Sequence, residues 1–560
     1  MTLFQQGQLA GLDELCALAI ELRKSRRLDE ATSVADRAAE LFPESAAPLR
    51  VKASVLRLQR RLPEAVDVLR RAVAIAPADS HLMFTLADVL DNSARYNEAV
   101  DAFATAVRLD PNSINARCGL AGALGHLGRL SDANANFAEA SRLRPAEPTL
   151  FSNVLFGMLF DPDVTPAALE KAHGQWWERF GRPLASSRQR HANDRSPDRV
   201  LRVGYVSPNF REHPIAFFIE PVLAAHRADQ VHAICYSDVL KHDATTARIR
   251  SRAHGWRETA NLDDAALDQL IRQDRIDILV DLTQHMARNR LTLFARKPAP
   301  VQVCYLGYPY STGLETIDYR LSDAHLDPPG AIAPGPEEVA LLESYFCYRP
   351  PDDAPDVNPE LPSRARVGAV TFGSMNQMMK INPQTLDAWV RVMRSIDGSR
   401  LLVKSQGLSD LLAHEPMLTE LRRRGIERVE LAGNSPLAEA MGQMSCNVDI
   451  ALDTFPYPGG TTSCHLLWAG VPVVTLEGAL PIHRLGATVL RTIGLGELVA
   501  RDIDDFVQIA IDLANDEPRR VELRATLRDR MRTSPLMDPA RFVRKLESLY
   551  RQMWQRWIAT

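Results

Sequence analysis

The chain has 560 residues, too many for one hydrophobic core, and this length predicts about three or four domains. Hydrophobic residues make up 46% and charged residues 24%, and the net charge of −4 excludes a global basic field that would hold nucleic acid or a membrane surface. The seven cysteines are scattered without a CxxC pair, which favours reduced thiols over zinc sites or disulfides. No apolar stretch reaches the roughly 18 residues of a membrane span, and the first residues lack a signal-peptide pattern. We therefore expect a cytoplasmic protein.

Residues 1–145 contain an internal repeat with a period of 34 residues. Small residues recur at this spacing, and a proline ends each repeat, at Pro43, Pro77, Pro111 and Pro145. Small residues at a helix crossing and a proline after the second helix are typical of the tetratricopeptide unit. Stacked units form an α-solenoid whose concave face commonly binds extended peptides. We expect a protein or peptide partner there; a scaffold or a homodimer contact is the alternative.

Residues 146–198 separate the repeats from the rest of the chain. Residues 146–182 keep a helical pattern, which we expect to cap the repeats, whereas residues 183–198 are polar and aperiodic, as in a linker. From residue 199 to residue 348, apolar runs alternate with helical segments, which predicts a Rossmann-like α/β domain. Residues 349–366 contain five prolines and predict a second linker.

Residues 367–538 repeat the alternation of apolar runs and helical segments and predict a second Rossmann-like domain, before a closing helix in residues 539–560. The predicted fold is therefore an α-solenoid followed by two α/β domains. Two such domains in tandem are typical of metal-independent nucleotide-sugar glycosyltransferases, although the fold alone does not fix the function. The expected strands are 201–206, 231–236, 276–282, 301–306 and 319–322 in the first domain, and 367–373, 401–404, 429–432, 448–452 and 471–476 in the second.

Ligands of doubly wound sheets gather at the carboxyl ends of the strands, so the loops there are the candidate site. The first such loop lies in YVSPNFREHP and places His213 before a helix. Histidine is the side chain best suited to proton transfer near neutral pH. The alternative is an ordinary surface histidine.

The second loop, in MNQMMKINP, carries Gln377 and Lys380 directly ahead of a helix that Asn382 caps. A cation is unfavourable at a helix N-terminus unless an anion shares the site. Lys380 therefore predicts an anion-binding position, although a solvated loop lysine is the alternative.

The third loop, PYPGGTT, follows the expected strand 448–452. Gly459 and Gly460 allow close approach of backbone to a ligand, and the helix that starts at Thr461 and Thr462 presents unpaired N–H groups. Such a helix end binds phosphate without a metal. The alternative is a tight turn with a threonine cap.

No metal site is expected. Metal-dependent transferases hold a divalent ion with a D-x-D sequence, and the one good candidate here is Asp502-Ile503-Asp504. It precedes a helical pattern and is more simply explained as a helix cap.

Taken together, the repeats, YVSPNFREHP, LGYPYSTG at 306–313, MNQMMKINP and PYPGGTTSCHLLWAGVPVVTL resemble the O-linked N-acetylglucosamine transferases, glycosyltransferase family 41. The resemblance covers nearly the whole chain. It implies inverting, metal-free transfer of N-acetylglucosamine from UDP-N-acetylglucosamine (UDP-GlcNAc) to Ser or Thr hydroxyls of proteins.

The resemblance also implies residue roles. Lys380 would neutralise the leaving diphosphate and Gln377 would contact the same donor, while Thr461 and Thr462 would give their amides to the phosphates. His213 would lie beside the acceptor, as a base or as a positioning group.

This sequence departs from the family pattern at several positions. Gly460 stands where eukaryotic members have histidine, and His465 stands where an acidic residue commonly anchors the ribose; by their place in the motif, both are expected to contact the donor. Ala438 and Met441 replace the residues that flank uracil in animal members. Along the repeats, the register of the animal asparagine ladder holds Val51, Thr85 and Gly119.

Two rival functions stay open at this point. The same framework could use another donor, such as GDP-fucose. Alternatively, the chain could be a tetratricopeptide adaptor whose transferase region is inactive, a hypothesis that His465 and the missing uracil contacts support.

Overall fold

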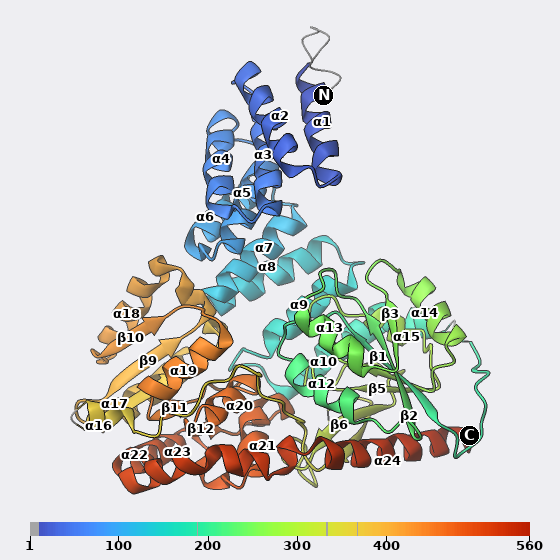
Figure 1. Ribbon diagram of the computed structural model, residues 1–560, viewed down its shortest axis with the longest axis vertical. Helices are drawn as coiled ribbons and strands as arrows, with labels where there is room; N and C mark the ends of the chain where they lie inside the picture. The colour runs from blue at the N-terminus through green and yellow to red at the C-terminus, as the bar shows by residue number, and fades with distance from the viewer. Residues whose placement is uncertain (1–10, 187–188, 332–333, 367) are drawn as a thin grey trace. The chain divides into compact units, whose positions relative to one another are not determined.

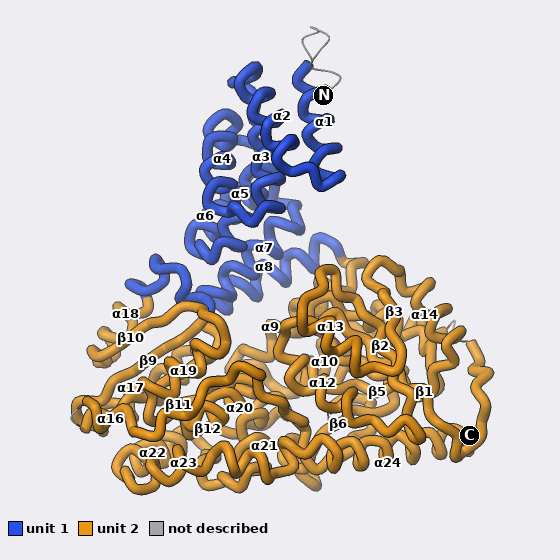
Figure 2. Tube along the Cα trace, in the orientation of Figure 1, with its two compact units in different colours: residues 1–144, 406–416 blue, residues 145–405, 417–560 orange. Residues whose placement is uncertain are grey.

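The computed structural model describes residues 11–186, 189–331, 334–366 and 368–560. The chain divides into two compact units, coloured separately in Figure 2: Met1–Arg144 with Gln406–Pro416, and Pro145–Ser405 with Met417–Thr560. Among the described helices, none combines the length and the apolar composition needed to cross a membrane.

In its described part, the smaller unit stacks four helix pairs, α1 to α8 in Figure 1. The second helices begin at Leu28, Leu62, Tyr96 and Leu130, which confirms the predicted period of 34 residues. The recurring alanines are buried where helices cross, because a small side chain lets two backbones approach closely. The helices are α1 Leu12–Lys24, α2 Leu28–Leu41, α3 Ala47–Leu58, α4 Leu62–Ile75, α5 Ser80–Asn92, α6 Tyr96–Leu109, α7 Ile114–His126 and α8 Leu130–Leu143.

Residues 406–416, from the second α/β series, belong to this smaller unit and contact α6. The backbone N and the side-chain Nδ2 of Asn97 donate to Asp410 Oδ2 over 2.8 and 3.0 Å. Gln406 Nε2 donates to the hydroxyl of Tyr96 over 3.1 Å. These bonds join segments more than 300 positions apart, which the repeat pattern does not predict.

The helices of residues 146–186 pack on the first α/β sheet, although the sequence predicts a cap on the repeats. Leu155, Trp176, Trp177 and Phe180 share one buried core with strand residues such as Val206. The helical period showed that this segment has an apolar face, but not which surface that face would cover. The elements are α9 Pro148–Met158, α10 Pro166–Trp176, a π-helical turn at Trp177–Gly181 and α11 Arg182–Ala185.

The described part of the larger unit contains two all-parallel sheets. The first has the strand order β3-β2-β1-β4-β5-β6-β7, and helices cover its faces. All five strands expected in this domain are present. Its elements are β1 Leu201–Ser207, α12 Ala216–Ala225, β2 Val231–Ser237, α13 Ala244–Arg252, β3 Gly255–Glu258, α14 Asp264–Gln273, β4 Ile278–Asp281, α15 Leu291–Ala295, β5 Val301–Cys304, β6 Tyr319–Asp323 and β7 Glu338–Leu342.

The second sheet has the order β10-β9-β8-β11-β12-β13. The strands expected here are also present, with β8 beginning at Thr371; Val367, where it was expected to start, lies outside the described residues. The elements are α16 Pro362–Ala365, β8 Thr371–Ser374, α17 Pro383–Arg394, β9 Arg400–Lys404, α18 His414–Arg423, β10 Val429–Ala432, α19 Leu437–Asn447, β11 Ile450–Leu452, α20 Thr461–Trp468, β12 Val473–Leu476, α21 Leu485–Thr492, β13 Val499–Ala500, α22 Ile503–Asn515 and α23 Glu517–Arg532.

The closing helix α24, Pro539–Ile558, returns to the first α/β domain, as Figure 1 shows. The Tyr550 hydroxyl lies 3.2 Å from that of Tyr205 on β1. Glu547 accepts hydrogen bonds from the backbone N and the side-chain Nε of Arg227. Because the chain ends on the domain where the α/β region began, the two α/β domains are tied together by more than the segment 349–366.

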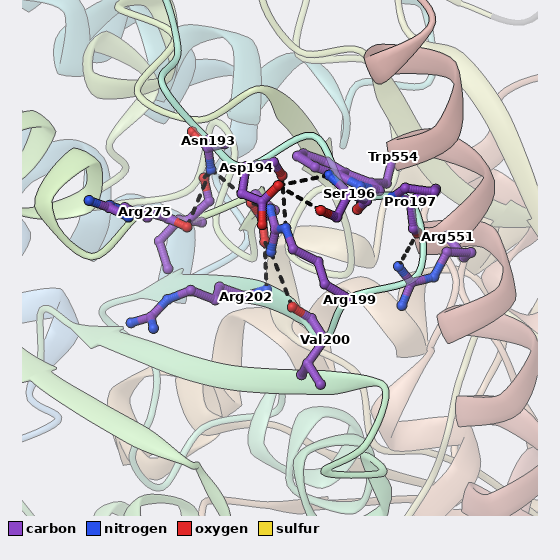
Figure 3. Close-up of polar contacts among 12 residues, drawn as sticks. Asn193, Asp194, Ser196, Pro197, Arg199, Val200, Arg202, Arg275, Arg551 and Trp554 are labelled. Atoms are coloured by element: carbon purple, nitrogen blue, oxygen red, sulfur yellow. Dashed lines mark hydrogen bonds and ion pairs between the residues drawn. The ribbon is translucent and has the colours of Figure 1, made fainter.

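Residues 193–200, predicted to be mostly linker, are held in place by hydrogen bonds (Figure 3). Asn193 and Arg199 donate to the carboxylate of Asp277, and so does the backbone N of Arg202 on β1. From α24, Trp554 Nε1 donates to the carbonyl oxygen of Ser196. A segment without periodicity is thus ordered by one buried carboxylate.

We predict that Asp277→Ala destabilises the first α/β domain by about 3–5 kcal/mol, because removing one partner of a buried ion pair leaves the other charge uncompensated. Hydrogen exchange of the amides in residues 195–205 should accelerate, and the thermal unfolding temperature should fall. Asp353→Ala, at an exposed position, is the matched control. Unchanged exchange in Asp277→Ala would contradict the anchoring role.

Candidate active site

A cavity of about 280 Å³ in the larger unit is lined by both α/β domains and by the segment around α9. Six of the seven predicted site residues line it: His213, Gln377, Lys380, Gly460, Thr461 and Thr462. The structure therefore brings together three sequence clusters that are separated by up to about 250 positions.

The position of this cavity follows from strand order. In each sheet the order reverses beside the first strand, between β1 and β4 and between β8 and β11. Loops leave opposite faces of the sheet at such a point and open a crevice at the carboxyl ends of the strands. His213 follows β1, Lys380 follows β8, and Thr461 follows β11.

The loop between β11 and α20 is organised by the carboxylate of Asp453. Its Oδ1 accepts hydrogen bonds from the backbone N of Thr454 and Gly459, and its Oδ2 accepts from the Thr475 hydroxyl. Burial raises the pKa of Asp453, and these bonds oppose that rise. In the sequence, Asp453 only follows the expected strand 448–452. No sequence pattern indicates that the loop folds around its carboxylate.

Asn376, beside the predicted Gln377, connects this anchor to the helix start. Its Nδ2 donates to Asp453 Oδ1 over 3.0 Å, and its Oδ1 accepts from the Thr462 hydroxyl over 3.2 Å. The amide thereby fixes the first turn of α20 against the loop that follows β8. Gln377 lines the same cavity and is exposed.

Helix α20 points its N-terminus into the cavity, since Gly460, Thr461 and Thr462 line it. The first N–H groups of a helix have no intrahelical acceptor and carry a partial positive charge. A Cβ at Gly459 would lie 2.4–2.5 Å from the Ser463 and Thr462 hydroxyl oxygens, so a larger residue there would force these side chains in the first turn of α20 to move.

Lys380 supplies the cation of the site. Its Nζ donates to the carbonyl oxygen of Pro458 over 2.8 Å and lies 4.0 Å from the centre of the Tyr457 ring. Burial lowers the pKa of Lys380 to about 8, and nearby Asp453 partly opposes that shift. An anion in the cavity would favour the charged form of Lys380. The sequence predicted an anion at this position because Lys380 precedes a helix.

His213 lies on the side of the cavity formed by the first α/β domain. Burial lowers its pKa to about 4, with Arg211 contributing, so the imidazole is neutral near pH 7. Its Nδ1 lies 3.3 Å from the backbone N of Ile215 and accepts a hydrogen bond from it. A neutral imidazole that accepts at Nδ1 carries its proton on Nε2.

His465 does not belong to the described residues that line the cavity. It lies in the fifth position of α20, buried, with Nδ1 2.8 Å from the Tyr348 hydroxyl and its ring against Phe217. Burial lowers its pKa to about 3. Its predicted contact with the donor thus gains no support from this arrangement and stays a prediction.

Aromatic side chains, which the sequence did not predict, also line the cavity. Phe160 stacks on Tyr457 with ring centres 4.6 Å apart, and Phe346 stacks on Phe218 at 4.4 Å. Phe156 lines the cavity as well. The run LFSNVLFGMLF at 150–160 was the available signal for Phe156 and Phe160, but it was expected to cap the repeats. The lining of the cavity is thus partly aromatic and partly polar.

Asp502 caps α22 by accepting a hydrogen bond from the backbone N of Asp505, as predicted from the sequence. Asp504 instead pairs with Arg391. Among the described residues, no three His, Cys, Asp or Glu side chains are grouped to hold a metal ion. The cationic groups that do line the cavity are Lys380 and the start of α20, and together they can bind a diphosphate.

Tandem Rossmann-like domains around one cavity, lined by a lysine and a helix N-terminus, are the architecture of the two-domain nucleotide-sugar glycosyltransferases. The model of glycosyl transferase family 41 matches residues 182–348 and 360–546, and tetratricopeptide repeat models match 16–80 and 84–148. The chain therefore belongs to glycosyltransferase family 41.

Several relatives support this assignment. The tomato (Solanum lycopersicum) protein named probable UDP-N-acetylglucosamine–peptide N-acetylglucosaminyltransferase SPINDLY is 41% identical over 413 residues, covering 72% of this chain and 44% of that protein. The Arabidopsis thaliana relative SEC, with the same enzyme name, is 30% identical over 63% of this chain and 37% of its own. The chain thus spans less than half the length of these plant proteins.

A solved structure covers nearly the whole chain. The O-GlcNAc transferase of Thermobaculum terrenum, solved as a point mutant, superposes with a TM-score of 0.84 at 34% identity, over 92% of this chain and 98% of that one. The predicted solenoid followed by two α/β domains is confirmed.

We predict that affinity for a nucleoside diphosphate falls as pH rises through about 8, because the free protein then loses the Lys380 ammonium. Above that pKa the dissociation constant of UDP should rise about tenfold per pH unit. Lys380→Arg keeps its charge at these pH values and should flatten the profile. An unchanged profile in Lys380→Arg would show that another group titrates.

Proposed function

We propose that this chain transfers N-acetylglucosamine from UDP-GlcNAc to Ser or Thr hydroxyls of proteins, with inversion and without a metal ion. The observation that carries the proposal is the convergence of Lys380, the N-terminus of α20 and His213 on one cavity. The names of the plant relatives and of the bacterial enzyme support the same donor and acceptor class.

Inversion requires a single displacement. The acceptor oxygen attacks the anomeric carbon from the side opposite the diphosphate, and the bond from that carbon to the β-phosphate oxygen breaks. The electron pair of the broken bond goes to UDP, and the hydroxyl proton goes to a base. Lys380 and the amides of Thr461 and Thr462 stabilise the charge that grows on the diphosphate.

His213 fits a positioning role in this reaction better than that of the base. With Nδ1 accepting from Ile215, the ring proton is on Nε2, and an Nε2–H group has no lone pair for the acceptor proton. It can instead orient a sugar or acceptor oxygen. The base is therefore a group other than His213 in this ring orientation.

The proposal is tested by offering the purified chain UDP-GlcNAc or GDP-fucose together with bacterial protein acceptors. We expect mass spectrometry to find N-acetylhexosamine on Ser or Thr, undiminished by excess EDTA. Transfer from GDP-fucose alone would replace the donor assignment. If neither donor nor nucleotide shifts the unfolding temperature, the chain is an adaptor with an inactive transferase region. Activity that returns only with added magnesium would contradict the metal-free mechanism.

We predict that Lys380→Ala lowers kcat by roughly 100–1,000-fold, because removing one stabiliser of transition-state charge has this effect in other active sites. UDP affinity should weaken by a smaller factor, since charge on the diphosphate grows in the transition state. Lys380→Arg should restore only part of kcat, because a planar guanidinium does not replace a compact ammonium. Lys171→Ala, an exposed lysine on α10, is the matched control and should leave kcat unchanged.

A further inference from the structure

A second cavity, of about 300 Å³, lies within the repeat unit and is lined by the first helices of three successive repeats, α1, α3 and α5. We call it the repeat groove. Its described lining residues include no asparagine or glutamine, so a bound chain would meet no amide side chain there. It presents Arg23, Arg50 and Arg57, with Val51 and Phe84 between them.

Two of the three arginines of the groove, Arg23 and Arg50, differ from the arginines that precede the second helices of the repeats. At the start of each second helix, Arg27, Arg61, Arg95 and Arg129 pair with an acidic residue three positions later. In the described part of the chain, Arg23 and Arg50 have no such partner. Arg57 contacts Asp88 across the groove and stays about half exposed. Two guanidinium groups are thus available to a bound anion.

The groove also has an apolar contact surface. Phe84 is only partly buried and packs against Phe103, with ring centres 5.9 Å apart, which fixes its position. Val51, in the neighbouring helix α3, is buried and also lines the groove. An aromatic ring held by its neighbours binds a large apolar side chain at little cost in conformational entropy.

We propose that the repeat groove binds an extended acidic segment of the protein acceptor, with a large apolar side chain about three residues from an acidic one. Arg50 and Phe84 occupy equivalent positions 34 residues apart, on neighbouring first helices. Packed helices lie about 10 Å apart and an extended chain advances about 3.3 Å per residue, which gives the spacing of about three residues. That the bound segment belongs to a glycosylation acceptor rests on the proposed function. That the groove binds an acidic segment does not.

A peptide fits the groove better than a nucleic acid does. Asp88 lies in the groove, and Asp91 follows one turn later on α5. These carboxylates repel a continuous run of phosphates but tolerate a peptide whose acidic residues sit only opposite the arginines. The net charge of −4 of the whole chain also opposes non-specific binding of nucleic acid.

The test measures fluorescence anisotropy of a labelled peptide of about twelve residues, with Asp at every third position and one Phe three residues from an Asp. A peptide with Asn in place of each Asp and a single-stranded DNA of similar length are the comparison probes. The full chain is compared with Arg23→Ala/Arg50→Ala and with Arg71→Ala, an exposed arginine on α4 outside the groove. An unchanged circular dichroism spectrum and unfolding temperature show that each variant is folded.

We expect the acidic peptide to bind at least tenfold more tightly than the neutral one, and Arg23→Ala/Arg50→Ala to remove that difference while Arg71→Ala keeps it. High salt should weaken binding. Equal affinity of both peptides, no binding of either, or insensitivity to the double substitution overturns the proposal, and so does tighter binding of the DNA through the same arginines. If the chain binds the peptide but transfers no sugar, the result supports the binding chemistry of the groove and contradicts the proposed function.

Discussion

The site depends on the buried carboxylate of Asp453. It receives hydrogen bonds from Gly459 in the glycine loop, from Asn376 after β8 and from Thr475 on β12. Burial of a charge is unfavourable unless its hydrogen bonds are satisfied, and these bonds satisfy it. Burial also lowers the pKa of Lys380, which lies in the same region. The protein therefore holds a destabilised cation near a helix N-terminus, a cost that a bound diphosphate would relieve.

The cavity also needs the first α/β domain. His213 lines it from that domain, together with Phe218. Helix α24 fastens the end of the chain to that domain through Tyr550 and Glu547. These contacts, remote from the cavity, join the closing helix to one of the two domains that line it.

Much of this fold could be predicted from the sequence, because periodic patterns record which faces are buried. The repeat period located eight helices, and apolar runs located the central strands of both sheets. Three strands were not predicted, β3, β7 and β13, and each is an edge strand. Edge strands are short and less completely buried, so they lack a continuous apolar run.

The candidate site could be predicted where a residue conflicts with its local surroundings. Lys380 ahead of a helix and glycines before Thr461 are such conflicts, and both line the cavity. Asp453, Asn376 and Phe160 show no local conflict, since their roles arise from partners distant in sequence. For His465, the sequence predicted the position in the helix that begins at Thr461. It could not predict that the side chain points toward Tyr348.

The most direct measurement is a crystal structure of the chain with UDP. We expect the diphosphate within hydrogen-bond distance of Lys380 Nζ and of the backbone N atoms of Thr461 and Thr462, with no metal ion between them. A diphosphate bound elsewhere, or one bridged to the protein by a metal ion, would contradict this assignment of the site.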